Sequence, residues 1–69
     1  MNIKEKIGNR IRQPKQEKHF SQEAFADLCE LDRTYISSIE KGKRNVSIVN
    51  LEKITNTLKI NLSTLFNNL

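Results

Sequence analysis

Four well-marked helix starts constrain this sequence more than any other feature. Each consists of a residue that caps helix N-termini well, with an apolar residue before it and another four positions after it. The capping residues are Ser21, Asp32, Ser47 and Asn61, and the apolar pairs around them are Phe20 with Phe25, Leu31 with Ile36, Val46 with Leu51, and Ile60 with Leu65. Such a pair fixes the direction in which the chain enters a helix, so the sequence predicts four helices with defined starts.

A fifth helix precedes these four. Ile3, Ile7 and Ile11 recur every four residues, which places them on one helical face. No sustained alternation of polar and apolar residues occurs, and no Asn-Gly or Asp-Gly turn suggests a hairpin. We therefore expect an all-α fold with helices over about 2–18, 22–29, 33–40, 48–58 and 62–67.

The small size of the chain limits its stability and excludes several kinds of site. Its 69 residues predict one domain (1–69) with only a few kcal/mol of net stability, so support from a partner subunit is expected. Cys29 is the only cysteine and His19 the only histidine, which excludes an internal disulfide and a four-ligand zinc site. Because Cys29 has apolar neighbours, we expect a buried thiol rather than a redox centre or nucleophile.

Charge favours a polyanionic partner. Twelve Lys and Arg against eight Asp and Glu give a net charge of +4 and a pI near 9.5. No run of about 20 apolar residues could span a membrane and no signal peptide begins the chain, so a cytoplasmic protein is expected. No acid–base pair, nucleophile or phosphate-binding loop is present around His19 or elsewhere. We therefore expect no enzyme, no cofactor and no small-molecule ligand.

The second and third helices are short and joined by a tight turn, which is the arrangement of a helix-turn-helix over about 21–40. At about 100° per residue, Ile36 and Ile39 face inward on the third helix. The opposite face is formed by Thr34, Ser37, Ser38 and Lys41, with Arg33 and Tyr35 on its flanks. Such a face fits the major groove of DNA, where Thr and Ser approach base edges and Arg pairs with guanine.

Two segments carry a specific resemblance to a known family. Residues 21–26 read Ser-Gln-Glu-Ala-Phe-Ala, and residues 31–42 read Leu-Asp-Arg-Thr-Tyr-Ile-Ser-Ser-Ile-Glu-Lys-Gly. They resemble the helix-turn-helix of the lambda-repressor-like superfamily, and the likeness extends without gaps to Leu65-Phe66. Residues 31–37 and 44–54 are most similar to the controller proteins of restriction–modification systems. The resemblance implies a compact five-helix DNA-binding domain.

The resemblance also implies roles for single residues. Arg33, Thr34, Ser37 and Ser38 match or adjoin base-reading positions, and Gln22, Tyr35, Lys43, Arg44 and Asn45 match or flank positions that contact the DNA backbone. Most such contacts position the protein, and only a few specify sequence. Three alternatives stay open. Gln22 could serve only as a helix start, the Tyr35 ring could only pack on the edge of the core, and the basic turn at 41–44 could be only solvated.

Three further residues matter for the expected geometry. The resemblance implies an ion pair between Lys15 and Glu40 that ties the third helix to the first. Pro14 departs from the family pattern, and we expect a kink there, with a helix that ends near Gln13 as the alternative. Glu30 stands where relatives often have glycine, so we expect left-handed backbone and a strain of about 1 kcal/mol.

The end of the chain predicts a homodimer. A core stripe of Ile48, Leu51, Ile54 and Leu58 is followed by more apolar residues than one short helix can bury, and such surface usually marks an interface. The dimerisation region is expected over about 47–69, with Val49, Leu62, Leu65, Phe66 and Leu69 at the interface. The alternative is that Leu62 and Leu65 complete the core of the monomer and Phe66 caps it.

A two-fold dimer would place two recognition helices about one DNA turn apart, on a pseudo-palindromic operator of double-stranded DNA. The expected function is a sequence-specific transcription regulator. The resemblance implies activation at low concentration, by recruiting RNA polymerase, and repression at high concentration. A phage-type repressor or an antitoxin-like autoregulator would use the same surface. A more remote alternative is a helical protein–protein module whose basic face binds an acidic partner.

Overall fold

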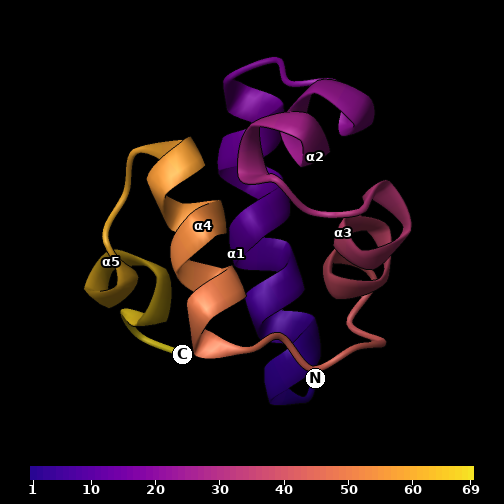
Figure 1. Cartoon of the computed structure of the whole chain (residues 1–69). Coiled ribbons are helices and arrows are strands. Elements are labelled where there is room, and N and C mark those ends of the chain that lie inside the picture. The colour runs from indigo at the N-terminus through magenta and orange to yellow at the C-terminus, as the bar shows by residue number, and fades with distance from the viewer.

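The computed structural model describes all 69 residues and consists of five helices without any strand. The helices are α1 (Ile3–Glu17), α2 (Gln22–Cys29), α3 (Arg33–Glu40), α4 (Ile48–Leu58) and α5 (Leu62–Phe66). These bounds lie within one residue of those expected from the sequence. α1 runs through the middle of the molecule, with α3 on one side and α4 and α5 on the other, while α2 lies at the end away from both termini (Figure 1).

Each helix begins at a side-chain cap. The side chains of Ser21, Asp32, Ser47 and Asn61 all accept hydrogen bonds from backbone amides in the first turn that follows them. Phe20 and Phe25, the apolar pair around the first of these caps, have ring centroids 5.4 Å apart. The four predicted helix starts are therefore confirmed. A fifth cap, which the sequence analysis did not identify, is Asn2, which forms a capping box with Glu5 at the start of α1.

Three of the four connections between helices contain a residue with left-handed backbone that is not glycine, and a fourth such residue, Asn68, follows α5. Glu30 has φ 59°, as expected, and His19 and Lys59 each have φ 60°. After Glu30, the amide of Leu31 donates to the carbonyl of Ala26 at 3.1 Å, which gives a backbone carbonyl in the last turn of α2 a hydrogen-bond partner. Equivalent bonds follow α1 and α4. The amide of Phe20 donates to the carbonyl of Lys15, and the amide of Ile60 donates to the carbonyl of Thr55. These apolar residues also precede the next caps, so one side chain fixes both a helix end and the following start.

One core contains residues from all five helices. Its members are Ile7, Ile11, Phe25, Ala26, Cys29, Ile36, Ile39, Leu51, Ile54, Leu58 and Leu65. Cys29 is buried as expected. Ile48 was expected in this core and is instead 64% exposed, because it is the first residue of α4 and no helix covers it. Leu65 was expected at a dimer interface and is only 1% exposed, because the cap at Asn61 turns it towards the core of the monomer.

Close contacts of α1 hold the other helices in place. A Cβ atom at Gly8 would lie 2.5 Å from the carbonyl oxygen of Ile39 and 2.7 Å from that of Glu40, so α1 and α3 cross too closely for a side chain. Arg10 donates to the carbonyls of Leu65 and Asn68 at the end of α5.

α1 continues through Pro14 to Glu17, so the alternative of a helix that ends near Gln13 is wrong, while the kink stays a prediction.

Candidate nucleic-acid interface

The outward face of α3 begins at a firmly capped helix end. The carboxylate of Asp32 accepts hydrogen bonds from the backbone amides of Thr34 at 2.9 Å and Tyr35 at 3.3 Å. This cap fixes the direction of α3 and with it the positions of the side chains that follow. Of the four residues expected to read bases, Arg33 and Thr34 are exposed and Ser37 and Ser38 are half-buried.

The beginnings of α2 and α3 meet at a polar hollow. Gln22 from α2 and Arg33, Thr34 and Ser37 from α3 line this hollow of about 250 Å³, and no apolar residue contributes to it. The structure thus brings together one residue expected to contact the DNA backbone and three expected to read bases. Their amide, guanidinium and hydroxyl groups can donate and accept hydrogen bonds towards base edges and phosphates.

Arg33 is only weakly held in the free protein. Its Nη1 atom lies 3.9 Å from Oε2 of Glu23, and the two side chains are 65% and 77% exposed. An ion pair this exposed contributes little, because water screens it and ordering two long side chains costs entropy. The guanidinium group is therefore available to a stronger acceptor such as the O6 and N7 atoms of guanine.

Tyr35 connects α3 to the loop and to α4. Its hydroxyl oxygen accepts a hydrogen bond from Nδ2 of Asn50 at 3.0 Å, and the guanidinium carbon of Arg44 lies 5.3 Å from the centre of its ring. The ring also packs against the core, as one of the alternatives anticipated. Sequence reasoning missed Asn50, because nothing in the order of residues indicates that a side chain of α4 reaches α3.

The loop between α3 and α4 is basic and exposed. It holds Lys43, Arg44 and Asn45, three of the residues expected to contact the DNA backbone, and begins after Lys41. Gly42 has φ 73°, and a Cβ there would lie 2.6 Å from the side chain of Glu5, so the turn is pressed against the start of α1. We call Gln22, Arg33, Thr34, Tyr35, Ser37, Ser38, Lys43, Arg44 and Asn45 together the recognition surface.

A buried ion pair lies beneath the recognition surface. Nζ of Lys15 is 2.7 Å from Oε1 of Glu40, and the two side chains are 11% and 7% exposed. The same Nζ donates to Oε1 of Gln22 and lies 6.0 Å from the centre of the Phe25 ring. The pair links α1 to α3, and Gln22 extends the link to the first residue of α2.

A second surface is apolar. Ile3, Ile48, Val49 and Phe66 are 57%, 64%, 61% and 39% exposed, and we call these four the apolar surface. All but Val49 line a groove of about 290 Å³ between α1, α3, α4, α5 and the loop that joins α3 to α4, where Arg44 and Asn45 also line it. Of the residues expected at a dimer interface, Val49 and Phe66 belong to this surface, whereas Leu62 and Leu69 are half-buried against the core.

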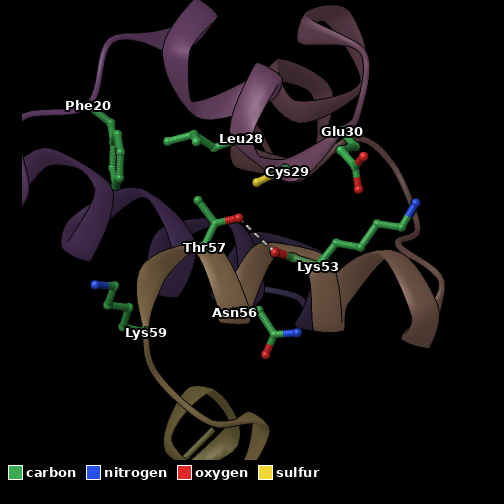
Figure 2. A pocket seen from close by; sticks show the side chains of 8 residues that line it. All are labelled: Phe20, Leu28, Cys29, Glu30, Lys53, Asn56, Thr57 and Lys59. Atoms are coloured by element: carbon green, nitrogen blue, oxygen red, sulfur yellow. Dashed lines mark hydrogen bonds between the residues drawn. The ribbon is translucent and has the colours of Figure 1, made fainter.

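The largest hollow lies elsewhere, between the ends of α2 and α4 (Figure 2). It has a volume of about 460 Å³, and no residue of the recognition surface lines it. The sulfur of Cys29 lies between α2 and α4 near Thr57, whose hydroxyl donates to the carbonyl of Lys53 (Figure 2). Burial raises the pKa of the Cys29 thiol, although a hydrogen bond with Thr57 opposes this change. The Cys29 thiol is therefore neutral near pH 7. Nowhere in the chain do three His, Cys, Asp or Glu side chains lie close enough together to hold a metal ion.

No helix of this chain has the length and apolar character needed to cross a lipid bilayer.

Comparison with known families identifies the helix-turn-helix family HTH_3, whose profile matches residues 10–65. The control protein C.MunI from Mycoplasma sp. is 56% identical over 68 residues, which cover 97% of this chain and 92% of C.MunI. Both matches include α2, α3 and the loop that follows them.

Two solved structures are also similar. The restriction–modification controller protein C.AhdI from Aeromonas hydrophila superposes with a TM-score of 0.88 at 43% identity, covering 91% of this chain and 96% of that chain. The controller protein C.Esp1396I, solved as a tetramer in complex with its natural 35-base-pair operator, gives a TM-score of 0.85 at 36% identity. That match covers 96% of this chain and 87% of that one.

Proposed function

This chain belongs to the helix-turn-helix family and is a restriction–modification controller protein, a non-enzymatic DNA-binding regulator of transcription, and from this premise we propose that it binds a pseudo-palindromic operator as a homodimer. The observation that carries the proposal is the polar hollow where α2 and α3 begin. Donors from two helices converge there, and the exposed cations of the following loop stand beside α3.

We assign direct reading of bases to α3. Arg33 is exposed and weakly paired, so it can turn to donate two hydrogen bonds to guanine. Thr34, Ser37 and Ser38 are short enough for α3 to lie deep in the major groove, where their hydroxyls and the Thr methyl meet base edges. Each good base contact of this kind discriminates by about 1–3 kcal/mol.

We assign contacts with the DNA backbone to the rest of the recognition surface. Gln22 contributes an amide, Tyr35 a hydroxyl, and the loop contributes Lys43, Arg44 and Asn45. Arg44 is supported in this role by the Tyr35 ring, which limits the directions its guanidinium can take. Contacts of this kind orient the protein on the duplex and make affinity fall as salt rises.

We assign dimerisation to the apolar surface. Four large apolar side chains exposed together are unfavourable in a chain of this size, and covering them with a second copy would bury all of them. Leu62 and Leu69, which pack half-buried against the core, stay part of the proposed interface, whereas Leu65 is left out because it is already buried. The multimeric state of C.Esp1396I on its operator supports an assembly of several chains on DNA. Sedimentation at micromolar concentration tests the assignment, and a monomer would contradict it.

The regulatory output follows from where the operator lies. We propose that one dimer upstream of a promoter recruits RNA polymerase in the cytoplasm, and that occupancy of a second site at higher concentration blocks the promoter. In this proposal the concentration of the protein itself decides which of the two sites is occupied. Transcription in vitro from an operator-bearing template tests this. Transcript levels should rise and then fall as protein is added, and a monotonic change would contradict the dual role.

A further inference from the structure

The buried ion pair beneath the recognition surface has a third member. Lys15 is 9% exposed, too little for direct contact with DNA, and its Nζ lies 2.7 Å from Oε1 and 3.0 Å from Oε2 of Glu40. The same Nζ donates to Oε1 of Gln22. An ammonium group has three N–H donors and no acceptor, and two of these donors are hydrogen-bonded, to Oε2 of Glu40 and to Oε1 of Gln22.

This geometry decides which end of the Gln22 amide faces outward. Because Nζ of Lys15 can only donate, Gln22 must turn its oxygen atom towards it and its NH₂ group away. The opposite orientation would place an NH₂ group against an ammonium group, two donors without an acceptor. Gln22 lines the polar hollow, so its two remaining N–H donors face the side where DNA would lie. A phosphate oxygen is an acceptor, and it matches these donors.

We propose that Lys15 is a positioning residue for DNA binding, which fixes the Gln22 amide so that its two N–H donors face the DNA backbone. This inference rests on the proposed contact of Gln22 with DNA. Glu40 contributes by holding the ammonium group in place from α3. An apolar pair at the same two positions could pack α1 against α3 equally well, but it could not orient Gln22.

The first test measures the order of glutamine side chains in the free protein. NMR relaxation of the side-chain NH₂ groups compares Gln22 with Gln13 and Gln16, two exposed glutamines of α1 that serve as internal controls. We expect a high order parameter for Gln22 and low values for the other two. Equal mobility of all three would overturn the proposal, and this test needs no substitution.

The second test is a double-mutant cycle on binding to a random-sequence duplex of about 30 base pairs at low salt. Phosphate contacts do not depend on sequence, so such a duplex reports them. Gln22→Ala should weaken binding about 10-fold in the otherwise unchanged chain, since a hydrogen bond to a charged group is lost. In a chain that carries Lys15→Met and Glu40→Leu, the same Gln22→Ala should change affinity less than about 2-fold. The paired substitution removes one positive and one negative charge, so the net charge stays at +4.

An equal loss from Gln22→Ala in both backgrounds would overturn the positioning role while leaving the proposed function intact. No binding of the unsubstituted chain to any duplex would overturn both. Gln22→Glu is a matched variant, because one carboxylate oxygen can still accept from Lys15 while the outward group becomes an acceptor. It should keep the melting temperature and bind DNA more weakly than Gln22→Ala does, and affinity equal to that of the unchanged chain would contradict the proposal. If the paired substitution fails to fold, the order parameters and Gln22→Glu decide the question.

Discussion

The recognition surface and the apolar surface differ in how their side chains are held, because two residues of the first, Gln22 and Tyr35, are fixed by hydrogen bonds within the protein and no residue of the second is. Tyr35 is bonded to Asn50 and stacked by Arg44, and Gln22 is bonded to Lys15. The four residues of the apolar surface form no such bonds, and their exposure ranges from 39% to 64%.

This difference follows from the physics of what each surface would bind. Hydrogen bonds to bases and phosphates weaken steeply with angle, so the donors need fixed directions before DNA arrives. Burial of apolar area has no preferred direction, so an apolar interface needs only matching shape. The buried ion pair of Lys15 and Glu40 accordingly lies beneath the recognition surface.

Val49→Glu should break the dimer. Val49 is 61% exposed, so the fold should survive, but a carboxylate would be buried without a partner when two apolar surfaces meet. Because the two recognition helices then no longer bind as one unit, operator affinity should fall at least about 100-fold. Sedimentation and operator titration measure both effects. Leu28→Glu is the control, because Leu28 is 60% exposed on α2, outside the apolar surface, and should keep the dimer. A dimeric Val49→Glu variant would show that the apolar surface does not mediate association.

Arg33→Ala should weaken operator binding by about 1–3 kcal/mol and relax the preference for one base. The reason is the loss of a bidentate contact rather than the loss of charge alone. Arg12→Ala, which removes the same charge from an exposed position on α1, is the matched control and should have a much smaller effect. Titration of both variants against the operator and single-base variants of it measures this. Equal losses of operator affinity for the two variants would show that Arg33 contributes only its positive charge to binding.

Gly8→Ala should lower the free energy of unfolding by about 1–3 kcal/mol, because the new methyl group would meet the carbonyl oxygens of Ile39 and Glu40 and force the backbones apart. Thermal denaturation followed by circular dichroism measures the change. An alanine at an exposed helical position, such as Gln13→Ala, should leave stability nearly unchanged. A Gly8→Ala variant with a higher free energy of unfolding would show that the backbones of α1 and α3 leave room for a methyl group at this position.

Glu30→Gly should be neutral or raise the free energy of unfolding by up to about 1 kcal/mol. Glu30 has φ 59°, a conformation that costs a residue with a Cβ more than it costs glycine. Lys59→Gly provides a parallel case at the end of α4, with φ 60°. Thermal denaturation of both variants checks the sign, and a clear drop in melting temperature for Glu30→Gly would refute the strain assigned to it.

The helices could be predicted because their signals are local. A cap and its two flanking apolar residues lie within six positions of each other, and all four predicted starts are present. The left-handed backbone at Glu30 was predicted from the resemblance, whereas the equivalent positions at His19 and Lys59 were missed.

What the sequence could not predict depends on contacts between distant residues. Nothing near Asn50 in the chain indicates its bond to Tyr35, and nothing near Gly8 indicates how closely α3 crosses there. The exposure of Ile48 has the same origin, because only the arrangement of neighbouring helices leaves the start of α4 uncovered. Leu65 differs, since it belongs to the apolar pair around the cap at Asn61, a local signal that already favoured its burial.

We propose that a dimer reads a defined DNA sequence through the recognition surface. Selection of bound species from a pool of randomised duplexes at two salt concentrations, followed by sequencing, tests it most directly. We expect recovery of a pseudo-palindrome whose half-sites are about 10 base pairs apart, at both salt concentrations. Recovery of no common sequence, with binding that vanishes as salt rises, would contradict it and leave only non-specific attraction to phosphate.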